Sequence, residues 1–283
     1  GLPLVGENRA AEKTTTYGVG QLIAHAVKSG AKKLIVGLGG SATNDGGTGA
    51  AAALGVRFLD KAGEAFVPVG ETLPKVHRID RSGLLPELAG VKIVTMCDID
   101  NPLCGKNGAA YVFGPQKGAS PEMVEYLDKA LAHLDEVITA DLGRSVKDLP
   151  GAGAAGGMGG GMVAFLGARL QMGIDTVLDT VKFDQLLAGT DLVITGEGKI
   201  DSQSLRGKVV AGVARRAKPS GVGVIAVVGD IGDDIEPMYE EGLCGIFSTN
   251  RVAVPFQQAK TRARNDLRLT MDNIFRFVKK ISH

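Results

Sequence analysis

The spacing of apolar residues along the chain predicts a mixture of helices and strands. Apolar side chains recur at helical intervals in segments 17–28, 121–142 and 262–281, which we expect to be amphipathic helices. Short apolar runs bounded by glycine, proline or aspartate are typical of buried strands. We expect strands at 33–37, 56–59, 65–67, 90–97, 191–195, 222–228 and 244–247, and shorter helices at 50–54, 162–168, 208–217 and 235–242.

The order of these elements predicts an α/β protein of two domains, residues 1–180 and 181–283. In the second domain strands and helices alternate regularly, which indicates a parallel sheet with right-handed crossovers. Only a few strands are expected there, so we expect this sheet to be incomplete. The terminal helix is expected to turn five residues toward the core: Leu267, Met271, Ile274, Phe275 and Val278.

A glycine-rich loop between the strand 33–37 and the helix 50–54 is the main candidate for a binding site. Glycines let a ligand approach the backbone closely, and the free N–H groups of a helix start favour an anion such as phosphate. The alternative is a tight turn capped by Asn44 or Asp45. The residues expected to bind a phosphate-bearing ligand are Gly39, Gly40, Ser41, Asn44, Asp45, Gly46 and Gly47.

The same loop also fits a relaxed dinucleotide-binding pattern. Gly37, Gly39 and Ala42 have the required spacing, and Asp60 follows at about the distance expected for a ribose-binding acid. No Gly-Lys-Ser/Thr sequence closes the loop, so it is not a Walker A motif. An NAD(P)-dependent dehydrogenase is therefore kept as an alternative function.

Further polar loops follow other predicted strands. Asp98 and Asp100 come directly after the strand 90–97, where they could bind Mg²⁺ or simply form a turn. Lys117 stands between glycines in a loop that could present its charge to phosphate or carboxylate. The glycine-rich segment 150–161 fits either a flexible linker or a second turn of close backbone approach, and we favour the turn. The loop 195–208 is dense in charge.

Composition excludes some classes of function. The net charge is +1 and tryptophan is absent, so a nucleic-acid partner is not expected. No apolar run is long enough for a membrane span. The 3 cysteines, Cys97, Cys104 and Cys244, form no Cys-x-x-Cys pair and indicate a reduced, cytoplasmic protein. A homodimer is left open.

Several of these stretches together resemble the class I glycerate kinases over essentially the whole chain. The matching motifs are Gly37–Gly47, Asp98–Leu103, Phe113–Gly118, Gly151–Gly157 and Thr195–Asp201. The resemblance implies ATP-dependent phosphorylation of D-glycerate, giving 2-phosphoglycerate more often than 3-phosphoglycerate, with ATP and Mg²⁺ as cofactors. It also implies a Rossmann-like domain made from both ends of the chain, with a mixed α/β domain inserted between them.

Two motifs that the family carries in an N-terminal portion, Asp-Ser-Phe-Lys and Ala-Asp-Gly-Gly-Glu-Gly, are not found in this sequence. We therefore expect a fragment, and an inactive one is an alternative. For phosphoryl transfer we assign Asp201 as the base or as the group that orients the hydroxyl, Lys199 to the transferring phosphoryl group, and Asp98 and Glu197 to Mg²⁺. Two further lysines, Lys117 and Lys208, are expected to bind the nucleotide.

Overall fold

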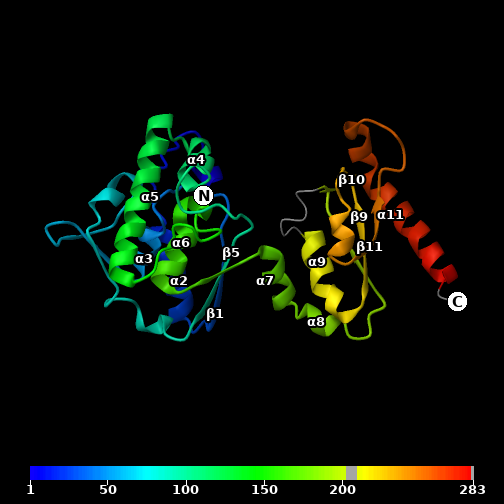
Figure 1. Ribbon diagram of the computed structural model, residues 1–283, viewed down its shortest axis with the longest axis horizontal. Helices are drawn as coiled ribbons and strands as arrows, with labels where there is room; N and C mark the ends of the chain where they lie inside the picture. Colours follow the sequence, from blue (N-terminus) through cyan, green and yellow to red (C-terminus); the bar gives the residue numbers. More distant parts are fainter. Residues whose placement is uncertain (202–208, 282–283) are drawn as a thin grey trace. The chain divides into compact units, whose positions relative to one another are not determined.

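The computed structural model describes residues 1–201 and 209–281. The chain divides into two compact units, Gly1–Gly173 and Ile174–His283 (Figure 1). Both units combine parallel strands with helices, which confirms the α/β class expected from the sequence. The division lies slightly before the boundary at 180/181 that the sequence suggested, because the helix that begins at Gly173 packs in the second unit.

The first unit is built on a parallel sheet with the order β1-β5-β6. Its helices are α1 (Leu2–Val5), α2 (Tyr17–Lys28), α3 (Thr48–Ala53), α4 (Ala109–Phe113), α5 (Pro121–Leu142) and α6 (Ala154–Leu166). Its strands are β1 (Lys33–Gly37), β2 (Arg57–Leu59), β3 (Ala65–Phe66), β4 (Arg78–Asp80), β5 (Lys92–Met96) and β6 (Arg169–Gln171).

One face of the parallel sheet is covered by helices. Leu34 and Val36 of β1 and Ile93 of β5 pack against side chains of α2, α3 and α6. Ile35 points to the other face and is exposed. This alternation is the period of two that a strand imposes on its side chains. Because β1 and β5 are parallel, their carboxyl ends lie at the same edge of the sheet, where the loops that begin at Leu38 and Cys97 start.

The core of the first unit lies between α5, α6 and a small antiparallel sheet of order β3-β2-β4. The aromatic rings of Phe58 and Phe165 pack edge to face, with centroids 5.4 Å apart. Helix α5 begins where Ser120 caps it by accepting the N–H of Met123 at 3.2 Å, and it ends at Gly143 in the left-handed conformation. The buried stripe of α5 follows the helical spacing expected from the sequence.

The second unit contains a parallel sheet of order β11-β9-β7. Its helices are α7 (Gly173–Thr180), α8 (Phe183–Leu186), α9 (Val209–Ala217), α10 (Pro237–Glu240) and α11 (Phe256–Ile281). Its strands are β7 (Leu192–Thr195), β8 (Lys199–Ile200), β9 (Gly223–Val228), β10 (Asp230–Ile231) and β11 (Leu243–Ser248). Strands β7, β9 and β11 lie where the sequence predicted them. Among the described residues, neither β7 nor β11 pairs with a further strand at the outer edge of this sheet.

The central strand β9 is buried on both faces, as its continuous apolar sequence indicates. Val224, Ala226 and Val228 pack with residues of α7, α9 and α10. Ile225 and Val227 pack with α11 on the opposite face (Figure 1). Helices on both faces of a parallel sheet make this a doubly wound arrangement.

The expected inner face of the terminal helix is partly wrong. Ile274 is buried at 5% exposure, and Met271 and Val278 pack beside it. Leu267 and Phe275 are 44% and 51% exposed. The helix has apolar residues on more than one side, and the position of the sheet decides which side is buried. No helix of the described residues is both long and apolar enough to cross a bilayer.

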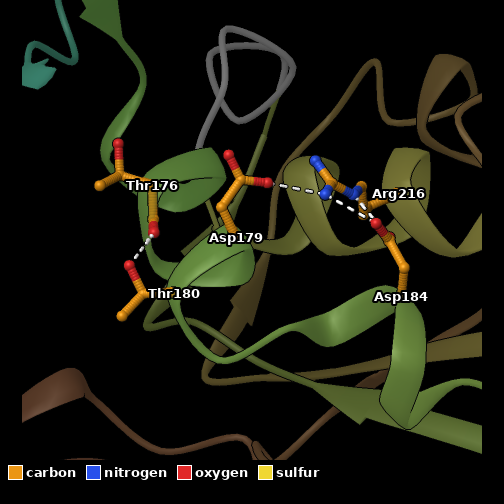
Figure 2. A network of polar contacts seen from close by, with 5 residues as sticks. All are labelled: Thr176, Asp179, Thr180, Asp184 and Arg216. Carbon is orange, nitrogen blue, oxygen red and sulfur yellow. Dashed lines mark hydrogen bonds and ion pairs between the residues drawn. The ribbon is translucent and has the colours of Figure 1, made fainter. Parts of the chain in front are cut away.

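Helix α7 is held to the second unit by a cluster of ion pairs (Figure 2). The guanidinium group of Arg216 on α9 contacts Asp184 at 2.6 Å and Asp179 at 2.7 Å. Within α7, the hydroxyl group of Thr180 donates to the carbonyl oxygen of Thr176 at 2.7 Å. The carboxylates hold the pKa of Arg216 above its ordinary value. This cluster explains why α7 belongs to the second unit.

We expect Arg216→Met to loosen segment 173–187 without unfolding the protein. The variant loses both ion pairs, and partly exposed pairs contribute only about 1 kcal/mol or less each. Hydrogen exchange followed by mass spectrometry should show faster exchange in this segment. Arg215→Met is the matched control, since Arg215 pairs with Glu241 instead. Unchanged exchange at 173–187 in Arg216→Met would contradict the role given to this cluster.

All three cysteines are free. Cys97 and Cys104 are buried in the first unit, and burial raises the pKa of both thiols. Cys244 lies on β11 in the second unit and is exposed. Cys97 is 5% exposed and fills space in the core of the first unit.

Candidate functional site

The glycine-rich loop runs from Leu38 to Gly47, between β1 and α3. Its conformation depends on the carboxylate of Asp45, which is completely buried. This carboxylate accepts hydrogen bonds from the backbone N–H of Thr16 at 2.7 Å and from its hydroxyl group at 2.8 Å. It also accepts the N–H groups of Gly47 at 3.1 Å and Gly49 at 3.3 Å. Asp45 therefore ties the loop to the start of α2.

Burial and hydrogen bonding act on Asp45 in opposite directions. Loss of solvent raises the pKa of this carboxyl group, while the donors of Thr16, Gly47 and Gly49 act to lower it. Both carboxylate oxygens are occupied by groups of the chain itself. The neighbouring Asn44 is equally buried, and its side-chain oxygen and nitrogen have no hydrogen-bond partner among the described residues.

A second glycine-rich turn packs against this loop. Ala155, Gly156 and Gly157 all have positive φ, although α6 formally begins at Ala154. A Cβ atom on Gly156 would overlap the carbonyl oxygen of Thr43, so only glycine fits there. The carbonyl oxygen of Gly156 in turn accepts the N–H of Gly46 at 3.0 Å. Segment 150–161 thus forms the close-approach turn that we favoured, and the linker alternative was wrong.

Two cavities share residues 38–41 in their lining. The larger one has a volume of about 490 Å³, and apolar side chains such as Val19, Val36 and Met158 form much of its wall. The smaller one has a volume of about 290 Å³. Both are lined by Gly39, Gly40, Ser41 and Ala155.

The backbone of this shared wall is open to a ligand. No acceptor for the N–H groups of Gly39, Gly40 and Ser41 lies among the described residues. Gly39 and Gly40 are also exposed. Successive unpaired N–H groups on a concave wall are suited to an anion.

Asp98 and Lys117 line the smaller cavity together with residues 39–41. One carboxylate oxygen of Asp98 accepts the N–H of Gly173 at 2.7 Å. The ammonium group of Lys117 donates to the carbonyl oxygen of Thr43 at 2.7 Å. The loops after β1 and β5 therefore meet at one cavity, as the parallel order of these strands leads one to expect.

The other predicted site residues belong to the second unit. Asp201 and Lys199 form an ion pair of 3.9 Å. Lys199 also lines a cavity of about 400 Å³ at the carboxyl ends of β9 and β11, with Asp230, Asn250 and Lys260. One carboxylate oxygen of Glu197 is buried without a partner among the described residues. Lys208 lies outside the described residues.

The described residues contain no cluster of three or more histidine, cysteine, aspartate or glutamate side chains that could hold a metal ion. Such a cluster is not required for Mg²⁺, which commonly uses one or two carboxylates together with water and substrate phosphates. The unpaired oxygen of Glu197 is a suitable ligand atom. Asp98 retains a second carboxylate oxygen beside the bond to Gly173.

The dehydrogenase alternative finds no support in this geometry. In a dinucleotide-binding unit the ribose-binding acid follows the parallel strand next to β1. Asp60 instead follows β2, which pairs only with antiparallel strands. Its carboxylate accepts the N–H groups of Ala62 at 2.8 Å and Glu64 at 3.0 Å, so Asp60 forms the β2–β3 turn.

Sequence reasoning missed two features of the larger cavity. Thr14, Thr15 and Thr16, which no sequence motif marked as site residues, line this cavity beside loop 38–43. Ala155 lines both cavities in a left-handed conformation that a non-glycine residue seldom adopts. The alternation of alanine with glycine in segment 150–161 was the only signal for it.

Gly39→Val tests whether the shared wall binds ligands. A Cβ atom on Gly39 meets nothing within 4 Å, and its φ is not left-handed, so stability should change by less than about 1 kcal/mol. The branched side chain would cover neighbouring N–H groups, and we expect ligand affinity to fall about tenfold or more. Calorimetry with ATP–Mg²⁺ and with D-glycerate, beside thermal unfolding, measures both effects.

The matched control is Gly18→Val, because Gly18 on α2 also has free space around it and lines neither cavity. Wild-type affinity for both ligands in Gly39→Val would show that the loop is only a turn.

Comparison with known proteins gives a consistent result over the whole chain. The family model described as the glycerate kinase family matches residues 1–279. A glycerate kinase of Bacillus subtilis (strain 168) is 45% identical over 266 residues, which cover 94% of this chain and 70% of the relative. A protein of Escherichia coli K12 named glycerate 2-kinase is 48% identical over 249 residues, covering 88% of this chain and 65% of the relative.

A solved structure shares the fold. It is the crystal structure of a Salmonella typhimurium LT2 protein proposed to be glycerate kinase 2, with a TM-score of 0.84 and 44% sequence identity. The comparison covers 100% of this chain and 74% of that chain. A glycerate kinase of Halalkalibacterium halodurans, 47% identical, is matched over 66% of its length and 88% of this chain. The chain thus spans about two thirds of the length of the curated relatives it matches.

Proposed function

Because this chain belongs to the glycerate kinase family, we propose that the whole protein transfers a phosphoryl group from ATP to D-glycerate. We further propose that the 2-hydroxyl group is the acceptor. The name of the Escherichia coli relative, glycerate 2-kinase, supports this choice.

One observation carries the proposal for this chain. The N–H groups of residues 39–41 have no acceptor among the described residues, and these residues line two cavities. A phosphoryl group in transit needs neutralisation of its oxygens more than it needs covalent chemistry. The wall provides fixed donors for that purpose, and fixed donors cost no reorganisation during the reaction.

Asp201 is our candidate for the group that accepts the proton of the substrate hydroxyl. Its carboxylate forms an ion pair with Lys199, 3.9 Å away. Lys199 is then near enough to neutralise charge on a phosphoryl group that approaches this pair. Its side chain remains more than half exposed, so it can adjust its position.

Glu197 and Asp98 are the residues that would hold Mg²⁺. The metal, when bound, would neutralise charge on the phosphate oxygens. Glu197 offers an oxygen without a partner among the described residues, and Asp98 has one oxygen beyond its bond to Gly173. We give Asp45, in contrast, the task of positioning the loop, since both its oxygens are occupied.

The proposal is tested by a coupled assay of ADP release with ATP, Mg²⁺ and D-glycerate. The relative from Bacillus subtilis is the positive control, because it is named a glycerate kinase and is longer than this chain. We expect ADP release that depends on D-glycerate, and phosphorus NMR of the product should show 2-phosphoglycerate. Binding of D-glycerate without turnover would indicate that this chain alone is inactive. Binding of neither substrate would refute the proposal.

A further inference from the structure

Lys117 is a buried cation at the wall of the smaller cavity. It ends the short turn Pro115–Lys117, and its side chain is 2% exposed. The next residue, Gly118, has a φ of 91°, and a Cβ atom there would meet the backbone of Arg9. This packing directs the chain so that the ammonium group of Lys117 reaches Thr43 at 2.7 Å.

The ammonium group has more donors than the protein uses. A lysine offers three N–H bonds, and the carbonyl oxygen of Thr43 accepts one of them. No carboxylate of the described residues forms an ion pair with Lys117. A buried charge without a partner is costly, and an anionic ligand in the adjoining cavity would compensate it.

The cavity itself favours a small polar acid. Its volume of about 290 Å³ lies at the lower limit of ligand pockets in general. A cavity of this volume is too small for a whole nucleotide. Its lining includes Lys117, Asp98, Gln116 and Ser41, residues that carry an ammonium group, a carboxylate, an amide and a hydroxyl group. A three-carbon hydroxy acid matches this set, since its carboxylate suits the lysine and its hydroxyl groups suit the acceptors.

We propose that Lys117 binds the carboxylate of D-glycerate in the smaller cavity and makes the site specific for an acid. This inference rests on the proposed function and replaces the expectation that Lys117 binds the nucleotide. The carbonyl oxygen of Thr43 fixes the ammonium group, while residues 39–41 on the same wall face the group to be transferred.

The proposed binding of glycerate by Lys117 should depend on pH, because the ammonium group can lose its proton. Burial lowers the pKa of Lys117 to about 8, and the carboxylate of Asp45 acts in the opposite direction. The other charged groups near it are Asp98 in the same cavity and Arg9, whose guanidinium group donates to the carbonyl oxygen of Gln116 at 2.7 Å. Above about pH 8 the free protein loses this charge, so affinity for glycerate should fall by up to about tenfold per pH unit.

The experiment compares D-glycerate with D-glyceramide, its neutral amide, as ligands of the wild-type protein and of Lys117→Met. We expect the affinity for D-glycerate to fall about 10- to 100-fold in the variant, while that for D-glyceramide changes little. Lys106→Met is the matched control, because Lys106 is exposed, stacks on Tyr111 at 4.3 Å and lies outside the cavity. Its affinities should equal those of the wild type.

A merely structural role for Lys117 would lower both affinities equally and keep their ratio, which would overturn the inference. If Lys117→Met does not fold, the wild-type protein decides the matter through calorimetry in two buffers of different ionisation enthalpy. Binding of D-glycerate at pH 9 should take up a proton, whereas binding at pH 7 should not; no uptake at pH 9 would overturn the inference. Failure of the wild-type protein to bind D-glycerate at all refutes the proposed function as well.

Discussion

Asp201→Asn is expected to lower kcat about 10²- to 10⁴-fold, the usual loss when a general base is removed. Asparagine has almost the same size but cannot accept the proton of the substrate hydroxyl. It also removes the charge that pairs with Lys199 at 3.9 Å. Because Asp201 is only half-buried, the fold should survive, and thermal unfolding should show a Tm near that of the wild type.

The control for this experiment is Asp191→Asn. Asp191 is an exposed acid that precedes β7, at the amino end of the strand, whereas Asp201 follows its carboxyl end. Ligand sites of parallel sheets lie at the carboxyl ends, so the control should retain full activity. An unchanged kcat in Asp201→Asn would remove Asp201 from the catalytic role. The variants must be made in a protein that shows ADP release dependent on D-glycerate in the coupled assay.

Gly156→Ala is expected to destabilise the first unit by about 2–4 kcal/mol. The new methyl group would overlap the carbonyl oxygen of Thr43, and the residue has a φ of 70°, which alanine adopts with strain. The loop that contains Thr43 would have to move away from the turn. Since Lys117 also binds that carbonyl oxygen, we expect affinity for glycerate to fall together with Tm.

Gly167→Ala separates the two causes of the lower stability, which are the overlap with the carbonyl oxygen of Thr43 and the strain of the left-handed backbone. Gly167 ends α6 with a φ of 64°, but a Cβ atom there meets nothing within 4 Å. It should cost only the strain of the left-handed backbone, about 1–2 kcal/mol, and should leave binding intact. Equal stabilities of the two variants would show that the loop yields to the added methyl group without cost.

The elements predicted well from sequence were those whose own pattern is strong. Segment 121–142 has a serine cap, a proline in its first turn and a regular apolar stripe, and all three act locally. The same is true of the continuous apolar run in β9. Strand β6, in contrast, was missed, because its three residues become a strand only through pairing with β5. No short-range signal marks such a segment.

In the candidate site, too, only the features that depend on local sequence or on strand order could be predicted. The position of the glycine-rich loop and the partnership of loops 37–47 and 98–103 could be predicted, because parallel strands place their carboxyl ends together. The task of Asp45 could not, since its partner Thr16 lies far away in the sequence and only the fold brings them together. In the sequence, an acid in a glycine-rich loop fits ligand binding as well as it fits a structural role. The burial of Asp45 and its hydrogen bonds within the chain distinguish these two roles.

The distribution of the cysteines allows selective chemical labelling of the second unit. Cys244 is exposed on the edge strand β11, while Cys97 and Cys104 are buried thiols of raised pKa. A maleimide dye should therefore modify the C-terminal unit at one position, with no engineered residue needed there. A second dye, on a cysteine introduced at an exposed site of the first unit, would complete a fluorescence energy-transfer pair. Such a pair would follow the separation of the two units in solution as nucleotide and glycerate are added.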